Sequence, residues 1–595
     1  MLRHTLRLLL IVFVAIGVIL TLSYFIDFST IKSKLDIYAV DKAANSFTAD
    51  IFRLIKLRLY IVGALIIGIG TWLIAFQHWL FPEKQPESTH LSIINKTKEI
   101  FANSFHEENQ PYTIALTIIV CIGMLFRTLF LFQPMRWDES YTFFQFVSRP
   151  LMFGLSDSYN FNNHLLHTIL AHLAFKLFGS DPWMLRLPVY ISGILLIPSV
   201  YAVSKIMYGK NTAIIAASFI SISSILTEYS TNARGYSILV LLCTWLIGIA
   251  ALLQRSNRRF LWILFIIIGS LGLYTIPIML YPLGGIFLWI LISITAKKPL
   301  PECICIIKQL TYSTISIGVL TLLLYTPTIA VSGLHAITAN EYVRPLAWNE
   351  FFSNVPRTIY QTWLEWNRDI PFPIPWILLG GFFFSLICHY KLGQPWFSIF
   401  LVTMLWCTVV LLFQRVNPWK RVWLFFLPLY FIMASAGITH ILYSISSLGK
   451  HYMYMNRLCP FIAIFLCIFL GLIGVRTQSV IYANMSSETL LDAEQISLRL
   501  KNLLHKGDGV VIICPSNYPL LYYFYKSNIS LAYFYFNQNI NASERVIVIL
   551  NKSRDVDTFS ALMNKAKISP SDFNQPYTLE NNKYSKILIA DRKRK

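Results

Sequence analysis

Residues 112–141 read YTIALTIIVCIGMLFRTLFLFQPMRWDESY, an apolar run from Tyr112 to Phe132 followed by two adjacent carboxylates, Asp138 and Glu139. The run is long enough to cross a bilayer, so the two acids lie just beyond the end of a membrane span. Ionisable groups at a membrane edge are costly to desolvate, which makes the pair a candidate functional site. The alternative is that both acids only favour a helix N-terminus in the interfacial loop.

The composition indicates an integral, multi-spanning membrane protein. Of the 595 residues, 55% are hydrophobic and 13% are charged, and the mean hydropathy is +0.56. A soluble protein cannot bury so much apolar surface, whereas a bilayer accepts it. The formal net charge of +21 is typical of basic loops that set orientation and contact anionic membrane lipids. The chain has no nucleic-acid-binding motif, so we expect no nucleic-acid partner.

Apolar runs near the ~20 residues needed to cross a bilayer recur along the chain. They must be helices, because a span in lipid has to satisfy its own backbone hydrogen bonds. We predict about thirteen spans by this length rule, near residues 5–26, 59–81, 112–133, 186–207, 212–230, 235–254, 260–275, 277–295, 308–331, 373–390, 396–413, 422–444 and 458–476.

Short basic loops predict the orientation of these spans. The loops 254–259 and 297–298 are basic, which is expected on the cytoplasmic side. Counting spans back from them places the N-terminus inside and the acidic pair outside. The loop 332–372 and everything after about residue 477 then also lie outside.

Two basic loops fall on the outside against this rule, 27–58 and 414–421. The first remains an exception to the predicted topology. The second is explained if its cations, Arg415, Lys420 and Arg421, bind a phosphate group.

Changes of composition divide the chain into parts. A polar stretch from Glu83 to Gln110 follows the first two spans, and beyond Ser486 helical spacing alternates with strand-like runs. Such alternation predicts a small α/β domain outside the membrane. We therefore predict an appended two-span module over 1–111, a main membrane body over 112–476 and a C-terminal α/β domain over 477–595, with strands at 510–514 and 546–550.

The connection after the acidic pair has about fifty residues, too long for a simple loop. Residues 141–147 are aromatic-rich and predict an interfacial helix. A second helix opens near Asn163 with His164 and His167, one helical turn apart. This spacing permits metal binding with a carboxylate from elsewhere. Histidines at membrane interfaces also serve as hydrogen-bond donors. We favour that role, and a divalent metal ion stays open as an alternative.

Several short motifs follow the acidic pair in order: Asn163-His164, Phe178-Gly179-Ser180, Arg186-Leu187-Pro188, Tyr208-Gly209 and Ala233-Arg234-Gly235-Tyr236-Ser237. Their order resembles that of the GT-C glycosyltransferases, especially the bacterial branch related to protein O-mannosyltransferases and to the aminoarabinose transferases of lipid A. The similarity covers roughly 112–254, and more loosely Arg421 to Pro428 and the C-terminal domain. Leu165 stands where the family usually has Pro, and the first two spans are additional.

The resemblance implies a polytopic α-helical membrane protein of GT-C type with interfacial helices in its first large external loop. Members of that family move a sugar from a polyprenyl-phosphate carrier to an acceptor on the outer face. The implied partners are a lipid-linked sugar donor and a lipid, glycan or protein acceptor. The implied location is a bacterial inner membrane with an extracytoplasmic active site. No cofactor is implied with certainty.

The same resemblance assigns roles to residues of this chain. Asp138 is the general base for the acceptor hydroxyl, and Glu139 positions the acceptor or a metal ion. Cations on the external side hold the departing phosphate, although a single interfacial Arg often only reaches the headgroups. The candidates for the phosphate are Arg186, Arg234, Arg415, Lys420 and Arg421, and those for the substrate are Asn163, His164, His167, Tyr236 and Arg344.

Two other classes of function compete with glycosyl transfer. In a transporter or lipid flippase, Asp138 and Glu139 would form an ion or proton site. Transporters usually place such carboxylates near the bilayer midplane, often between repeated halves, and this sequence has no visible repeat. A membrane scaffold for the C-terminal domain gives no reason for acids, histidines and arginines to share one side.

Overall fold

The structure is a computed structural model. It describes residues 2–38, 47–80, 110–157, 162–296, 298–338, 344–393, 397–447, 452–482, 489–536, 543–552 and 558–593. Apart from Gln110, the polar stretch predicted from Glu83 to Gln110 lies outside the described residues.

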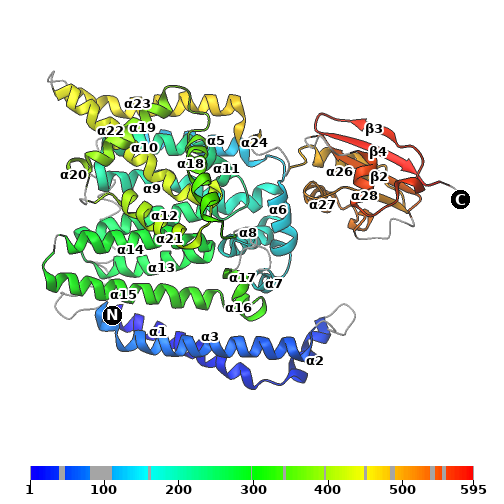
Figure 1. The fold of residues 1–595 in the computed structure, drawn as a ribbon, viewed down its shortest axis with the longest axis horizontal. Helices are drawn as coiled ribbons and strands as arrows, with labels where there is room; N and C mark the ends of the chain where they lie inside the picture. The colour runs from blue at the N-terminus through cyan, green and yellow to red at the C-terminus, as the bar shows by residue number, and fades with distance from the viewer. Residues whose placement is uncertain are drawn as a thin grey trace.

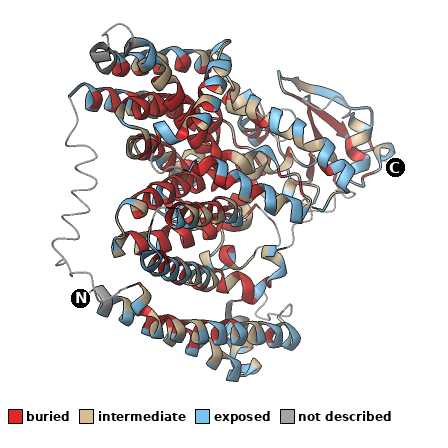
Figure 2. Ribbon diagram, turned by 60° about the vertical axis from the view of Figure 1, so that its left-hand side comes forward, coloured by how far each residue is buried: buried red, intermediate tan, exposed pale blue. Residues whose placement is uncertain are grey.

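The main membrane body is a bundle of helices (Figure 1). The longer helices are α5 (Gln110–Leu131), α9 (Pro182–Tyr208), α10 (Lys210–Ile222), α12 (Tyr236–Arg255), α13 (Arg259–Thr275), α14 (Leu280–Thr295), α15 (Leu300–Leu324), α18 (Trp348–Trp366), α19 (Ile374–Ile387), α21 (Ile399–Gln414), α22 (Leu427–Ser447) and α23 (Tyr452–Thr477). The shorter ones are α11 (Ser224–Ser230), α16 (Thr326–Val331), α17 (His335–Thr338), α20 (His389–Leu392) and α24 (Ser479–Tyr482). Figure 2 shows the buried residues concentrated at the centre of the bundle, where α10 and α12 are buried on almost every side.

The prediction of a polytopic helical membrane protein is confirmed, but the number thirteen is not. Among the described residues, nine helices are long and apolar enough to cross a membrane, or ten if the bent pair α10–α11 is one span. The predicted spans 260–275, 373–390 and 396–413 form helices of 17, 14 and 16 residues. A helix rises only 1.5 Å per residue, so the shortest of them covers about 21 Å, less than the ~30 Å hydrocarbon layer.

The predicted span 212–230 is broken. Helices α10 and α11 meet at Ser223 with a bend of 60°. A break inside a bundle leaves backbone carbonyls that need new donors. Arg127 of α5 supplies them, because its guanidinium is fully buried and donates to the carbonyl oxygens of Ser221 (2.6 Å) and Ile220 (3.2 Å). A cation inside the third span thus stabilises the kink that carries α11.

The first two spans form a helical hairpin at the edge of the bundle (Figure 1). Helices α1 (Leu2–Leu22) and α3 (Ala49–Ala75) pack together, and α2 (Phe28–Tyr38) lies between them in sequence. A Cβ atom at Gly63 would lie 2.7 Å from the Gly17 carbonyl oxygen, so only glycine permits this approach. The hairpin contacts α15 and α16.

The loop after α5, predicted to be external, contains short helices. Helix α6 (Trp137–Thr142) carries the acidic pair in its first turn and continues into a wide turn over Phe143–Val147. Helices α7 (Leu151–Ser156) and α8 (Leu165–Phe178) follow. They lie at the end of the bundle from which the C-terminal domain extends (Figure 1).

The C-terminal part is a small α/β fold, as predicted, with a four-stranded sheet in the order β1-β2-β4-β3. The strands are β1 (Asp508–Val511), β2 (Arg545–Asn551), β3 (Tyr577–Asn581) and β4 (Ser585–Asp591), and the helices are α26 (Ala493–Lys501), α27 (Asn517–Lys526) and α28 (Phe559–Lys565). Strands β1 and β2 are parallel, and the other pairs are antiparallel. The sequence identified β1 and β2 but not β3 and β4.

Helix α27 attaches this domain to the acidic loop. The backbone N–H of Met135 donates to the Tyr523 hydroxyl (3.3 Å), and Lys526 forms an ion pair with Asp181 (3.2 Å). The Tyr522 hydroxyl donates to a backbone carbonyl in the turn before α9. The acidic loop and the C-terminal domain therefore share one end of the membrane body.

Candidate active site

Asp138 and Arg234 line a cavity of about 440 Å³ at the end of the bundle that carries the C-terminal domain. Its walls come from α6, α11, the segment after α11, α18 and a 3₁₀ helix over Lys420–Phe426. Among the described residues, five cations line it against three carboxylates, which favours an anionic ligand. The cations are Arg136, Arg234, Arg368, Lys420 and Arg421, and the carboxylates are Asp138, Glu228 and Glu365.

Asp138 faces the cavity from the first turn of α6. One carboxylate oxygen forms an ion pair with the Arg234 guanidinium. The other oxygen accepts a hydrogen bond from the Asn162 side-chain amide (3.0 Å). The Asp138 side chain is 18% exposed and that of Arg234 is 6% exposed. The carboxylate is thus held in place by two side chains while one part of it stays accessible from the cavity.

Glu139 points away from the cavity and is fully buried. Its carboxylate receives two hydrogen bonds of 2.7 Å from the Arg186 guanidinium, a bidentate ion pair. Burial opposes ionisation, but Arg186 and the backbone N–H of Arg136 (3.0 Å) hold the pKa of Glu139 below its ordinary value. Arg186 also donates to the carbonyl oxygens of Leu131 and Gln133. Glu139 and Arg186 therefore both hold the loop through these hydrogen bonds.

The irregular segment 231–235, between α11 and α12, carries Arg234 and is buried throughout. Glu139 accepts from the backbone N–H of Ala233 (2.8 Å), and Nδ1 of His164 accepts from that of Gly235 (2.8 Å). A Cβ atom at Gly235 would lie 3.1 Å from Cβ of His164, so glycine permits this close contact. Burial, aided by the charge of Arg234, holds the pKa of His164 well below its ordinary value and keeps Nδ1 an acceptor.

Asn232 presents a polar atom to the cavity from the same segment. Its side chain is 5% exposed and lines the cavity. Within the described residues, its side-chain oxygen accepts no hydrogen bond. A buried acceptor without a partner is costly, so a ligand that donates a hydrogen bond here is favoured.

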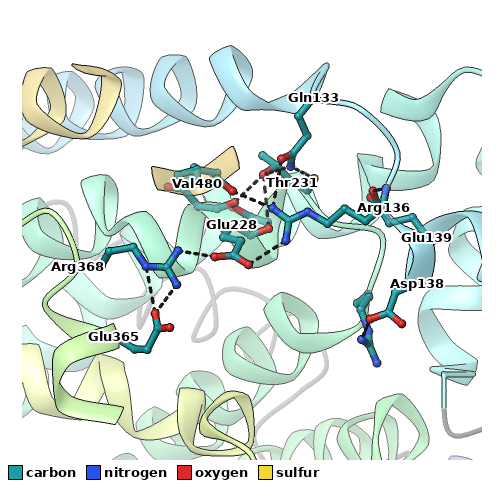
Figure 3. Close-up of polar contacts among 12 residues, drawn as sticks. Gln133, Arg136, Asp138, Glu139, Glu228, Thr231, Glu365, Arg368 and Val480 are labelled. Carbon is teal, nitrogen blue, oxygen red and sulfur yellow. Dashed lines mark hydrogen bonds and ion pairs between the residues drawn. The ribbon is translucent and has the colours of Figure 1, made fainter. Parts of the chain in front are cut away.

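The inner wall of the cavity is an ion network centred on Glu228 (Figure 3). This carboxylate of α11 pairs with Arg136 (2.9 Å) and with Arg368 (2.5 Å). Arg368 also pairs with Glu365, which lies 3.7 Å from Lys420. Arg136 donates a further hydrogen bond to the carbonyl of Val480 (2.8 Å). The network joins the acidic loop, the broken span and α18 into one wall.

Arg421 differs from the other cations of the cavity. Within the described part of the chain, no carboxylate lies within ion-pair distance of it. Its guanidinium lies over the rings of Trp419 (4.3 Å) and, more distantly, Tyr236 (6.0 Å). Contacts with aromatic faces leave the N–H groups at the edge of a guanidinium able to bind an anion. Tyr236 itself is buried against His164 and does not line the cavity.

Two predicted cations lie away from the cavity. Arg415 lies 5.7 Å from the ring of Trp348, and Arg344 is exposed. Neither side chain lines the cavity. Arg186, as described above, is buried against Glu139.

Asn163 and His167 form hydrogen bonds within the loop and do not line the cavity. The Asn163 amide donates to the carbonyl oxygens of Gly154 (2.7 Å) and Asp157 (2.9 Å). His167 lies with Nε2 3.2 Å from the Leu185 carbonyl oxygen, so Nε2 donates. The predicted donor role therefore fits His167, whereas His164 accepts through Nδ1. No group of three or more possible metal ligands occurs among the residues that the structure describes.

Comparison with known proteins gives a partial family match and a fold. The family described as dolichyl-phosphate-mannose-protein mannosyltransferase matches residues 164–334, less than a third of the chain. The crystal structure of ArnT from Cupriavidus metallidurans in the apo state is similar, with a TM-score of 0.53 and 11% identity, over 80% of this chain and 98% of that one. This chain has the GT-C fold.

The same protein bound to undecaprenyl phosphate matches this GT-C chain with a TM-score of 0.51 and 11% identity, over 80% of this chain and 97% of that one. No curated protein matches the chain in sequence. The predicted resemblance to the GT-C glycosyltransferases is confirmed by the family match and the fold. The family match begins at His164, beyond the acidic pair, and includes Arg186 and Arg234.

Three residues of the cavity, Glu228, Arg136 and Arg368, were not predicted from the sequence. A signal for Glu228 was present, because it is the only charged residue in the apolar run 212–230 and an acid inside a span usually has a partner and a role. Arg136 precedes the acidic pair directly. Nothing in the sequence indicates that Arg368 reaches the same cavity, since the contact joins residues 140 positions apart.

Proposed function

We propose that this chain transfers a sugar from a polyprenyl-phosphate donor to an acceptor hydroxyl or phosphate, in the cavity lined by Asp138. The observation that carries the proposal is the joint position of one accessible carboxylate and several cations in a single cavity, at the ends of membrane helices. A related fold has been crystallised with undecaprenyl phosphate, which supports a polyprenyl phosphate as the lipid partner. Asp138 and its cavity face the extracytoplasmic side.

Asp138 acts as the general base in this proposal. An acceptor hydroxyl is a weak nucleophile, and it attacks the anomeric carbon as Asp138 takes its proton. The bond between the anomeric carbon and the phosphate oxygen breaks, and the polyprenyl phosphate leaves with the electron pair. Attack from the face opposite the phosphate inverts the anomeric centre. The ion pair with Arg234 holds the Asp138 carboxylate in position before the substrate arrives.

Arg234 and Arg421 hold the phosphate. Both line the cavity, and Arg421 has no competing carboxylate within the described residues. Negative charge grows on the phosphate as the bond breaks, so fixed guanidinium groups stabilise the transition state more than the ground state. Lys420 contributes from the rim, where its side chain is 43% exposed and its ammonium lies 3.7 Å from Glu365. Arg136 and Arg368 are already engaged with Glu228 and set the wall of the cavity.

Purified full-length protein in lipid nanodiscs tests the proposal. The protein is mixed with a panel of polyprenyl-phosphate sugars and an envelope lipid and glycan extract, and release of polyprenyl phosphate is followed by mass spectrometry. We expect release with at least one donor, in step with a new glycoconjugate. Release with none of the donors, together with ion-coupled uptake in reconstituted vesicles, would overturn the proposal in favour of a transporter.

A genetic comparison identifies the sugar and the acceptor. Mass spectrometry of glycolipids, wall polymers and glycoproteins from cells with and without the gene identifies what is lost. The Asp138→Asn variant serves as the control, because it preserves the protein in the membrane while removing the base. We expect deletion and Asp138→Asn to remove the same glycoconjugate. Loss on deletion alone would contradict a catalytic origin.

A further inference from the structure

A second cavity, of about 330 Å³, lies at the opposite end of the membrane body. It is formed by the end of α9, the first turn of α10, α20 and α22. Lys210, Lys391 and His440 line it, and no acidic residue in the described part of the chain does. Among the described residues, no carboxylate lies within ion-pair distance of either lysine. The Lys210 ammonium instead lies 4.8 Å from the centre of the Tyr112 ring. The balance of charge in this cavity favours an anion.

Side-chain hydrogen bonds fix the walls of this cavity. Asn211 of α10 bonds to the hydroxyls of Tyr112 in α5 and Tyr443 in α22. The hydroxyls of Thr212 and Thr439 lie 2.9 Å apart and join α10 to α22 a second time. A cavity whose walls are cross-linked in this way is largely formed before a ligand arrives, which lowers the entropic cost of binding.

Helix α9 runs from the end of the membrane body that holds the Asp138 cavity to the second cavity. It begins at Pro182, one turn before Arg186, and ends at Tyr208, which lines the second cavity. At 1.5 Å per residue its 27 residues span about 40 Å, more than the ~30 Å hydrocarbon layer. The second cavity therefore lies at the level of the lipid headgroups on the membrane face opposite Asp138. Figure 1 shows α20 at the end of the body remote from the C-terminal domain.

Exposed apolar side chains lie within four residues, along the chain, of residues that line the second cavity. Ile387 at the end of α19 is 77% exposed, Tyr390 of α20 is 66% exposed and Ile445 of α22 is 62% exposed. Such side chains belong in contact with acyl chains rather than with water. A ligand that combines a negative headgroup with acyl chains matches this arrangement of charge and apolar surface better than a free anion does.

We propose that this second cavity binds the phosphate headgroup of an anionic membrane lipid. Lys210 and Lys391 provide the positive charge and the hydrogen-bond donors, and the acyl chains lie along α19 and α22. The site is separate from the cavity around Asp138 and does not depend on the proposed transfer reaction. It fixes the depth and orientation of the membrane body from the opposite leaflet.

Native mass spectrometry of the full-length protein with phosphatidylglycerol, phosphatidylcholine or inorganic phosphate tests this site. The test variants are Lys210→Gln, Lys391→Gln and the double variant. The matched control is Lys298→Gln, on the same membrane face but paired with Glu302 outside the cavity. A lysine near a membrane surface contributes about 1 kcal/mol, so we expect phosphatidylglycerol to bind about fivefold more weakly in each single variant and about 25-fold more weakly in the double variant.

We expect phosphatidylglycerol to bind more tightly than phosphatidylcholine, and Lys298→Gln to behave as the unaltered protein. Equal binding of the two lipids, or binding that the double variant does not change, would overturn the proposal. Saturation by inorganic phosphate with no preference between the lipids would overturn the assignment to a lipid. Lys391 is exposed, so its single variant keeps the test decisive if the double variant does not fold.

Discussion

Two neighbouring carboxylates of α6 lie in opposite kinds of surroundings. Glu139 and Arg186 form a closed pair in which both side chains are 0% exposed, whereas Asp138 and Arg234 form an open pair at 18% and 6%. Successive residues of a helix point about 100° apart, so one turn of α6 directs one acid into the protein and the other into the cavity. Two adjacent acidic residues thus have different roles because their side chains point in different directions.

The closed pair supports the open one. Glu139 accepts from the backbone N–H of Ala233, directly before Arg234, and it anchors the N-cap residue Arg136 directly before α6. The buried carboxylate of Glu139 therefore holds both the segment that carries Arg234 and the turn that carries Asp138. The comparison predicts that changes at the open pair remove activity and that changes at the closed pair remove the folded protein.

The largest effect on activity is expected at the open pair. Asp138→Asn removes the base but keeps the size of the side chain. We expect kcat for sugar transfer to fall by about 10²–10⁴, with little change in thermal unfolding. Steady-state release of polyprenyl phosphate and a melting curve on the same sample check both parts. A parallel loss of folding would mean that Asp138 is structural, as Glu139 is.

The closed pair should govern stability instead. Glu139→Gln or Arg186→Met leaves an unpaired charge in a fully buried site, a change that costs about 3–5 kcal/mol. We expect little folded protein on size-exclusion chromatography in detergent. Glu580→Gln is the control, because its partner Arg499 is 53% exposed and an exposed pair contributes about 0–1 kcal/mol. Normal folding of both Glu139→Gln and Arg186→Met would contradict the structural role.

The open and closed pairs show how much of the site can be predicted from the sequence. Apolar runs predict the helices, and the acidic pair marks the end of the bundle that holds the cavity. The different directions of Asp138 and Glu139 were not predictable, because they depend on where α6 packs. The break at Ser223 is hidden in a continuously apolar run, and its stabilisation by Arg127 is a contact between distant residues. Strand β3 was missed because its side chains are mostly exposed and polar.

A smaller effect is expected at the phosphate-binding cations. Arg421→Gln removes a charged donor from the cavity while leaving Asp138 in place. A hydrogen bond to a charged group is worth about 1.5–3 kcal/mol, so we expect kcat/KM for the donor to fall about tenfold to a hundredfold. Arg415→Gln is the matched control on the same loop, because its side chain lies outside the cavity. Equal effects of the two substitutions would assign both cations to lipid headgroups.

The smallest effect concerns pH. Burial keeps the pKa of His164 well below its ordinary value near 6.5, so the unfolded chain binds a proton that the folded chain does not. The stability from neutral His164 is fully present above about pH 6.5 and falls by up to ~1.4 kcal/mol per pH unit below it. His164→Gln keeps an acceptor for Gly235 and should flatten this slope between pH 5 and 7 in melting curves. An unchanged slope would place the titrating group elsewhere.

The most direct test of the account is a cryo-electron microscopy structure of the full-length protein in nanodiscs with undecaprenyl phosphate. We predict phosphate density within hydrogen-bond distance of Arg234 and Arg421, with Arg234 shifted from Asp138 toward the phosphate and Arg186 still bound to Glu139. A phosphate located outside the Asp138 cavity, or an Arg186 that leaves Glu139 to bind it, would contradict the division between an open functional pair and a closed structural one.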